Sequence, residues 1–422
     1  MALLTRKGLV LPSRIEPAVS QPVVILPADT LRVYLPLSYT GSRARCLLST
    51  NEVVYPGKQI AESADDGQPV MRAHVFGVFA GLRDASHPLY GQLECAAIDC
   101  MPSPVSESPA AKNFDKLRPA DVLEAAEAAG IIDELDGHYL YRKLEEYREN
   151  YCDLVIADGA ENQGYASSAW AVMNESVEQI WMGVQLAALA LRATAGQINV
   201  RLKRNRRRPL ARRINNEKAI FQVRRRYPAV KLEKNPWGRR ICRIGVQACL
   251  ALYRAAVYGE MHGSCVVTVS GDAVKSPRNI RAPFGTTAEK LLEICGLKAD
   301  PVRLLSGDVM TGRAAESDRM LILPGVTCLL ALTEEAVPAH GVCCGCGRCV
   351  GVCHAGLLPF EIVRRVENMQ YEQLASLRPD TCDGCGCCSH VCPAGRELSD
   401  QVSSARDTNS RIYSSWEEED EI

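Results

Sequence analysis

The chain has 422 residues, of which 47% are hydrophobic and 23% are charged, and its formal net charge is −1. Such a composition is ordinary for a folded protein of two to four domains. No apolar run reaches the roughly 18 residues that a membrane-spanning helix needs, and no secretory leader precedes the first strand-like stretches. We therefore expect a reducing compartment, in which a disulfide scaffold is disfavoured.

Residues 1–104 are predicted to form short strands, because apolar stretches such as "PVVILP" and "LRVYLPLS" alternate with turn residues. The stretch "VVYPGKQIA" followed by "MRAHVFGVFAGL" is typical of the barrel-sandwich pattern of biotinyl and lipoyl carriers. No lysine stands at the expected hairpin tip. We interpret this segment as a structural or docking module.

Residues 105–260 alternate helical and strand patterns, which favours an α/β layer with parallel strand pairing. "PADVLEAAEAAGI" and "NESVEQIWMGVQLAALALRATA" are predicted helices, whereas "CDLVIADGA" and "QINVRLK" are predicted strands. Residues 261–335 begin with a strand, a turn, an extended piece and a helix, which predicts a β-grasp domain. The stretch that separates two later cysteine runs has helical spacing, so residues 336–405 should be mainly helical. Residues 406–422 form an acidic tail.

Two cysteine runs, "CCGCGRCVGVCHAG" and "CDGCGCCSHVCPAG", follow the same C-x2-C-x2-C-x3-C register. This register is that of two-cluster ferredoxins, in which the fourth cysteine of each run ligates the other cluster. Zinc is the weaker alternative. A zinc site takes four ligands in two C-x-x-C pairs, and it would not explain the three-residue spacer that ends each run. Cys344 and Cys387 fall out of register, and nine further cysteines are interpreted as free residues, mostly in apolar runs. The predicted ligands are Cys343, Cys346, Cys349 and Cys392 for one 4Fe–4S cluster, and Cys382, Cys385, Cys388 and Cys353 for the other.

The order of these segments resembles the RnfC family of iron–sulfur subunits of electron-transport complexes, and its relative PduS, a flavin-containing cobalamin reductase. The resemblance rests on "GLVLPSRIEP" and "LRVYLPLSYTGSRARCLLSTNEVVYPGKQIAES" near the amino terminus, on "VVTVSGDAVKSPRNI", and on the two cysteine runs. It implies an amino-terminal barrel-sandwich module, a domain like the flavin subunit of respiratory complex I, an SLBB-like β-grasp domain and a two-cluster ferredoxin domain.

The flavin loop is where the sequence departs from this family. The family's Gly-rich FMN loop follows Ala-Gly-Ile, but here Ala129, Gly130 and Ile131 lead into "IDELDGHYLYRKL". Carboxylates at Asp133, Glu134 and Asp136 replace the glycines that let backbone N–H groups approach a phosphate. The next FMN segment keeps only Glu161 and Tyr165. We therefore expect FMN to be absent, and these two residues to be cofactor-binding only if FMN is retained.

The segment from Arg201 to Arg226 carries twelve Lys or Arg residues against one acid, Glu217. A solvated face and a docking site for an acidic redox partner are both consistent with it. Few aromatic residues interleave the charges and no recognition fold is apparent, so nucleic acid is not expected.

The leading hypothesis is an RnfC-like electron-transfer protein that passes single electrons through two 4Fe–4S clusters. One alternative is an FMN-containing, NADH-dependent reductase, and another is a structural or assembly subunit of a redox complex. An electron-transfer subunit is favoured over a stand-alone enzyme. We expect a cytoplasmic location, with attachment to the cytoplasmic face of a membrane complex as an alternative.

Overall fold

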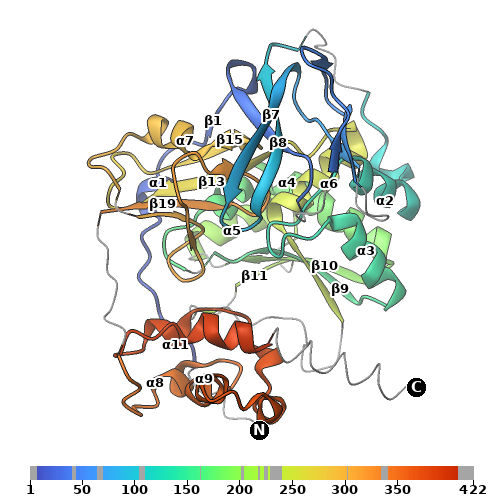
Figure 1. Ribbon diagram of the computed structural model, residues 1–422. Helices are drawn as coiled ribbons and strands as arrows, with labels where there is room; N and C mark the ends of the chain where they lie inside the picture. Colours follow the sequence, from blue (N-terminus) through green and yellow to red (C-terminus); the bar gives the residue numbers. More distant parts are fainter. Residues whose placement is uncertain are drawn as a thin grey trace, which may run out of the picture.

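The protein is a mixed α/β chain of several folding units, which confirms the class predicted from the sequence (Figure 1). In Figure 1 the carboxy-terminal helices, drawn in orange and red, lie to one side of a larger body that holds all the sheets. The computed structural model describes residues 7–39, 44–63, 70–103, 110–161, 163–200, 204–216, 219–222, 227–228, 240–301, 303–333 and 341–406.

Two antiparallel sheets form most of the amino-terminal part of the body. A four-stranded sheet has the order β2-β8-β7-β4, and a three-stranded sheet has the order β3-β5-β6. Their apolar faces share one core, in which Val33, Ile60 and Ile98 are fully buried. The strands are β2 (Arg32–Pro36), β3 (Ala44–Cys46), β4 (Val53–Val54), β5 (Gln59–Ser63), β6 (Met71–Arg72), β7 (Gly77–His87) and β8 (Gly91–Cys100), and a 3-10 turn η1 (Ala28–Thr30) precedes them.

The predicted parallel sheet is present, with the order β11-β10-β9-β12, and the recorded pairs are all parallel. Its second strand from one edge, β9, is buried from Val155 to Gly159, as expected for a parallel strand covered on both faces. The strands are β9 (Leu154–Gly159), β10 (Ala195–Val200), β11 (Ile220–Gln222) and β12 (Ile241–Gly245), and the accompanying helices are η2 (Phe114–Lys116), α2 (Pro119–Ala128), α3 (Leu140–Glu149), α4 (Ser168–Leu191), α5 (Arg204–Arg213) and α6 (Val246–Tyr258).

Helix α4 is the longest helix of the described chain, and most of its apolar residues are buried against α6 and the parallel sheet. It begins at Ser168, six residues before the predicted start at Asn174, and its backbone leaves helical geometry at Ser176. Within the described residues, no helix is both long and apolar enough to cross a membrane.

A six-stranded sheet, β1-β14-β13-β19-β16-β17, contains the predicted β-grasp strands and one strand from the amino terminus. Strand β1 lies parallel to β14, with Val24 opposite Ile280. Residues near position 24 therefore complete a sheet whose other strands lie beyond residue 263. The elements are α1 (Glu16–Val19), β1 (Val24–Ile25), β13 (Ser264–Ser270), β14 (Arg278–Pro283), β15 (Thr286–Thr287), α7 (Ala288–Cys295), β16 (Arg303–Ser306), β17 (Arg313–Ala314), β18 (Leu321–Ile322) and β19 (Cys328–Leu332).

The carboxy-terminal unit, residues 341–406, is built from short helices around its own apolar core. Ile362, Val363 and Leu374 are fully buried there, and Cys349 and Cys388 join them. The helical prediction for the stretch between the cysteine runs is confirmed. The elements are α8 (Arg348–Val352), α9 (Pro359–Glu367), η3 (Tyr371–Gln373), α10 (Leu374–Leu377), η4 (Pro379–Thr381) and α11 (Cys387–His390).

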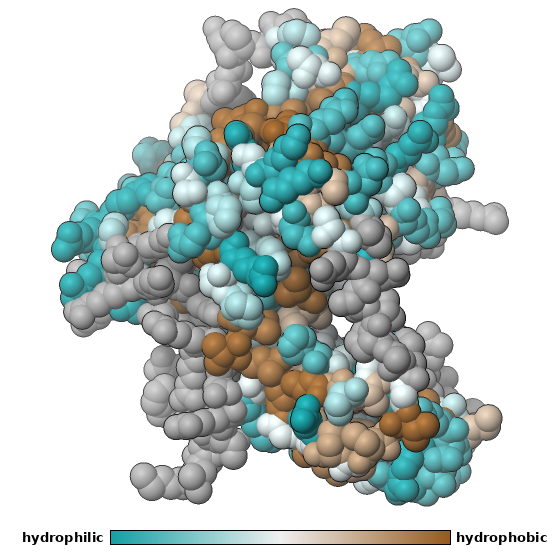
Figure 2. Space-filling model, turned by 90° about the vertical axis from the view of Figure 1, so that its left-hand side faces the viewer, coloured by the Kyte–Doolittle hydropathy of each residue, from teal (hydrophilic) through white to brown (hydrophobic). Residues whose placement is uncertain are grey.

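The amino-terminal segment connects this unit to the body. The backbone N–H of Gly8 donates to the carbonyl of Val352 at 2.9 Å, and Leu9 forms a bridge with Tyr227. The Tyr227 hydroxyl donates to the carbonyl of Cys385 at 2.7 Å. Figure 2 shows hydrophobic surface at the level of this junction, in keeping with the small apolar cluster that Leu11 and Tyr227 form with the unit.

The crossing of α4 and α6 allows no side chain at Gly183. A Cβ there would lie 1.9 Å from the carbonyl oxygen of Cys249. We expect Gly183→Ala to lower the free energy of unfolding by about 1–3 kcal/mol, because the two helices must separate. The exposed residue Gln185 in the same helix provides the control, and Gln185→Ala should change stability by less than about 0.5 kcal/mol. Equal chemical denaturation midpoints for the two variants would contradict this account of the crossing.

Candidate metal centres and an adjoining cavity

The first set of cysteines surrounds a cavity of about 50 Å³ in the carboxy-terminal unit. Cys343, Cys346 and Cys349 of the first run line it together with Cys392, the last cysteine of the second run. Gly347 has φ 67, a left-handed conformation that glycine adopts readily, and α8 begins directly after it. Cys343 and Cys346 are exposed, whereas Cys349 is buried. This set therefore opens to the protein surface.

The second set surrounds a smaller cavity, of about 20 Å³. Cys382, Cys385 and Cys388 of the second run line it together with Cys353, the last cysteine of the first run. The backbone N–H of Leu357 donates to Sγ of Cys353 at 3.4 Å, and that of Gly384 donates to Sγ of Cys382 at 3.5 Å. Such N–H···S contacts are typical of thiolates that carry negative charge in a metal site. The chain thus gathers the eight predicted cysteines into two groups of four and exchanges the last member of each run.

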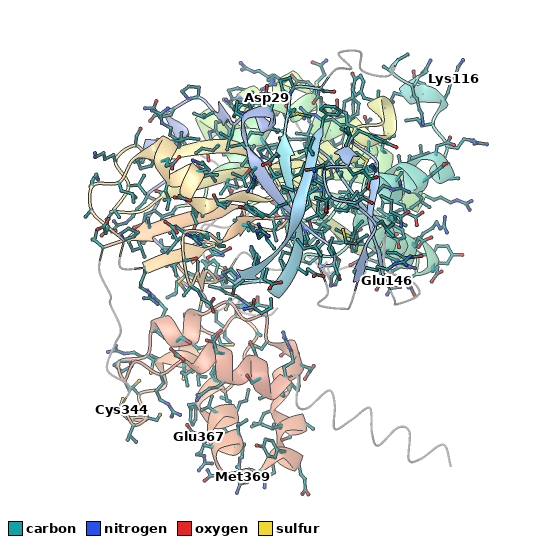
Figure 3. All side chains as sticks on the ribbon, turned by 45° about the horizontal axis from the view of Figure 1, so that its top comes forward. Asp29, Lys116, Glu146, Cys344, Glu367 and Met369 are labelled. Atoms are coloured by element: carbon teal, nitrogen blue, oxygen red, sulfur yellow. The ribbon has the colours of Figure 1, made fainter. Side chains whose placement is uncertain are left out.

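The two cysteines outside the register also line these cavities, Cys344 the first and Cys387 the second, but their surroundings differ. Cys344 is exposed, and Figure 3 shows it at the outer edge of the carboxy-terminal unit. Cys387 is buried, and its Sγ lies 3.7 Å from the carbonyl oxygen of Tyr227. Cys387 therefore packs in the junction with the body, a role that the sequence pattern could not indicate.

His354 stands beside the second set and contacts it across the two runs. Its Nε2 lies 2.9 Å from a carboxylate oxygen of Asp383, and together with Cys385 these side chains place their ligand atoms within 4.8 Å of one another. The hydrogen bond that His354 donates to the Asp383 carboxylate raises the pKa of the imidazole to about 9. The pairing adds a link between the run that holds Cys353 and the run that holds Cys382.

A larger cavity, of about 520 Å³, lies in the body. Its walls come from four segments that are distant in the sequence: residues 134–137, residues 160, 161, 163 and 166, residues 306–308 and 311, and residues 325 and 327, with Leu89 and Tyr90 completing them. Two of these loops are the segments where the resemblance to flavin proteins implies an FMN site. Glu161 lines this cavity, whereas Tyr165 is not among its described lining residues, and its ring lies under the Arg14 guanidinium.

Two carboxylates of this cavity accept hydrogen bonds from helix amino termini. Glu134 accepts from the backbone N–H groups of Gln247 and Ala248, in the first turn of α6, at 2.7 and 3.0 Å. Glu161 accepts from Ala169 and Trp170, in the first turn of α4, at 2.8 and 3.3 Å. Free N–H groups and the helix dipole make such positions favourable for anions. The chain's own side chains occupy both.

Burial opposes the charge of these carboxylates. It raises the pKa of Glu134 to about 8, and the neighbouring carboxylate of Asp133 adds to this shift. It raises the pKa of Glu161 to about 7, while the N–H donors of α4 act in the opposite direction. Both groups therefore titrate close to neutral pH.

Lys143 neutralises the remaining carboxylates of the 133–137 loop. Its ammonium group lies 2.6 Å from the fully buried Asp133 and 2.5 Å from Asp136. Asp133 also accepts N–H groups from Leu135 and Gly245. Because the lysine comes from α3, ten residues after Asp133, the loop is held by the helix that follows it. Sequence analysis identified the acids of this loop but not their cation.

The end of β16 and the loop after it supply two cavity residues that the sequence did not indicate. Asp308 is buried and accepts N–H groups from Tyr165 and Ala166 at 3.0 and 2.8 Å. Ser306 is 3% exposed, and its hydroxyl oxygen has no hydrogen-bond partner among the described residues. These residues lie about 145 positions after Glu161, so no local pattern could associate them.

The arginine-rich segment is only partly described. Arg213, at the end of α5, pairs with Glu178 of α4 and donates to the carbonyl of Glu175. Residues 201–203, 217–218 and 223–226 lie outside the described residues. Part of the predicted docking segment is thus a packed helix, and docking stays a prediction.

No family model matches the chain. Curated relatives do match it along most of its length. A subunit of the proton-translocating ferredoxin:NAD(+) oxidoreductase complex of Clostridium ljungdahlii is 24% identical over 375 residues, which cover 81% of this chain and 79% of that protein. The corresponding subunit of the ion-translocating oxidoreductase complex of Rhodobacter capsulatus is 27% identical over 376 residues, or 82% and 72% of the two chains.

The chain is similar in sequence to the C subunits of these RnfC-type complexes. The resemblance expected from the amino-terminal stretches and the two cysteine runs is confirmed. Among solved structures, a chain of an NAD+-reducing [NiFe]-hydrogenase in the H2-reduced state has a TM-score of 0.47 and 14% sequence identity, with 71% of this chain and 65% of that chain covered. The relationship to RnfC therefore rests on sequence.

We expect Lys143→Met to destabilise the protein by about 3–5 kcal/mol, because it leaves Asp133 charged and buried without its cation. Adding Asp133→Asn should recover part of this loss, since the amide oxygen can still accept the N–H groups of Leu135 and Gly245. Arg118→Ala, which breaks the exposed pair with Asp121, is the control and should cost less than about 1 kcal/mol. Equal losses for Lys143→Met and the control, measured by urea denaturation, would show that the buried pair has no structural importance.

Proposed function

We propose that this RnfC relative is an electron-transfer subunit of a ferredoxin:NAD oxidoreductase type of complex, and that it holds two 4Fe–4S clusters. The supporting observation is that the eight cysteines of the register line two cavities, four to each, with the last cysteine of each run exchanged, while Cys344 and Cys387 line the same cavities from outside the register. This exchange is the ligation pattern of two-cluster ferredoxins. Zinc would explain neither the exchange nor the three-residue spacer.

The residues present fit the clusters. Each cavity is lined by five cysteines, four in the repeated register and one outside it, and cysteine thiolate is the ligand that an ordinary 4Fe–4S cluster takes from protein. When bound, such clusters supply one-electron transfer at a potential set by hydrogen bonds to sulfur and by exposure. Leu357 and Gly384 donate N–H groups to the second set, and in addition the first set is more exposed to solvent. We infer that the exposed first set faces a protein partner and that the second set faces the body.

The carboxylates of the larger cavity do not fit the phosphate group of FMN. A flavin phosphate at the cavity would require free N–H groups at a helix amino terminus, and Glu134 and Glu161 already accept those of α6 and α4. A phosphate would also meet the buried carboxylate of Asp308. We therefore favour the cluster-only protein over an NADH-dependent flavin reductase.

The clusters make electron transfer a stronger proposal than a purely structural subunit. We propose protein redox partners within a membrane complex, because the named relatives are subunits of ion-translocating complexes. Attachment at a membrane surface would then be peripheral. Anaerobic reduction by dithionite, followed by electron paramagnetic resonance, separates the two proposals, because clusters that serve folding alone need not be reducible at physiological potentials.

The exchange of the fourth ligand leads to a direct test. We expect Cys353→Ala to perturb the signal of the cluster held by Cys382, Cys385 and Cys388, and Cys392→Ala to perturb the other signal. Each variant, purified without oxygen, should retain one unaltered cluster, seen in its resonance spectrum and in about half of the iron.

Cys344→Ala is the matched control, since it removes an exposed thiol next to a ligand but outside the register. It should leave the iron and sulfide content of the wild type unchanged. The assignment fails if Cys353→Ala alters only the signal that Cys343→Ala also alters.

The absence of FMN can be tested without activity. Protein incubated with excess FMN and then desalted should retain less than about 0.1 flavin per chain, because two internal carboxylates fill the positions that a phosphate needs. Flavin fluorescence after acid release measures the content. About one FMN per chain would replace the cluster-only proposal with the reductase.

A further inference from the structure

A side-chain pair joins the two cysteine runs at the second set. His354 directly follows Cys353, the cysteine that the first run gives to this set, and Asp383 directly follows Cys382 of the second run. The Nε2 atom of His354 lies 2.9 Å from a carboxylate oxygen of Asp383. The contact therefore joins the residue after the exchanged cysteine to the residue after its neighbour in the other run.

The pair lies in the wall of the second cavity, beside a predicted ligand. Both residues line the 20 Å³ cavity, and their side chains are only 20% and 10% exposed. One nitrogen of His354, one oxygen of Asp383 and Sγ of Cys385 lie within 4.8 Å of one another. The other carboxylate oxygen of Asp383 accepts the backbone N–H of Cys385 at 3.3 Å. The aspartate is thus held on two sides, close to a ligand thiol.

The sequence provides no equivalent pair at the first set. Pro393 follows the exchanged cysteine there, in the place that corresponds to His354, and Cys344 stands in the place that corresponds to Asp383. A proline side chain has neither a charge nor a hydrogen-bond donor, so these two residues cannot form an ion pair. The two sets therefore differ in one charged contact, although they share one cysteine register.

We propose that His354 is a positioning residue that compensates the carboxylate of Asp383 and thereby raises the reduction potential of the second cluster. This inference rests on the proposed function, because it concerns a cluster bound by the second set. A cluster gains negative charge on reduction, and hydrogen bonds and charges around its sulfurs tune its potential. A carboxylate beside Cys385 without its side-chain donor would oppose that gain, since like charges repel. With the imidazole as donor, the same carboxylate opposes reduction less.

Variants of the pair can be compared in the full chain, purified without oxygen, by redox titration at a single pH with detection by electron paramagnetic resonance. His354→Phe keeps a ring but removes both ring nitrogens. The equilibrium constant for reducing its second cluster should fall by about tenfold, a downward shift of about 59 mV for one electron. His354→Gln can still donate to Asp383 and should fall between the wild type and His354→Phe.

The sign of the shift separates charge compensation from support of the fold. Asp383→Asn removes the charge but keeps an oxygen for the N–H of Cys385, so it should make the second cluster easier to reduce. Adding Asp383→Asn to His354→Phe should recover most of the shift, because no uncompensated carboxylate is left. If His354→Phe alone does not retain its second cluster, His354→Gln and the double variant supply the same comparison.

The first cluster is the internal control in every sample and should keep its potential. Glu372→Gln, which removes an exposed carboxylate of the same unit, should shift neither cluster. The inference is overturned if His354→Phe leaves the second potential unchanged, if Asp383→Asn lowers it, or if both clusters shift alike. These outcomes need a wild type with two reducible clusters, so the proposed function would stand. Wild-type protein without iron and sulfide would overturn the proposed function, and this inference with it.

Discussion

The arrangement of the body depends on one constraint: backbone N–H groups at the start of a buried helix must find acceptors. Helices α4 and α6 both begin next to the 520 Å³ cavity, and both receive a carboxylate from a loop of the chain. Glu161 lies seven residues before the start of α4, and Glu134 lies more than a hundred residues before α6. The two contacts fix the loops around the cavity and set its charge at the same time.

The acidic loop at residues 133–137 can pack in the interior because its carboxylates have a cation and N–H donors as partners. Asp133 is fully buried, which would be strongly unfavourable for a lone carboxylate. Lys143 compensates it from α3, and Gly245 donates its N–H from the strand that precedes α6. A Cβ at position 245 would lie 2.0 Å from the carboxyl carbon of Glu134, so a side chain there would displace this carboxylate from the start of α6. Strand β12, helix α6 and the loop therefore form one hydrogen-bonded assembly.

The sequence predicted the parts of this protein that depend on local spacing. The cysteine register, the buried strand β9 and the helix between the cysteine runs all follow from residues close together in the chain. The sequence pattern predicts the start of α4 six residues late, because the first turn is stabilised by Glu161, outside the usual capping position. Lys143, Ser306 and Asp308 were missed because their roles come from contacts across the fold. Similarly, no pattern in "PVVILP" indicates that β1 pairs with a strand more than 250 residues later.

The loop between β16 and β17 connects the cavity to the carboxy-terminal unit. On one side, Gly307, Asp308 and Thr311 line the cavity. On the other side, Met310 packs in the junction cluster beside Cys385 and Cys387, and its carbonyl lies so close to Gly386 that no Cβ would fit there. Gln163 binds the backbone of Met310 and Thr311 and so ties this loop to the Glu161 segment. A single short loop therefore forms part of the cavity wall and part of the contact with the second cysteine set.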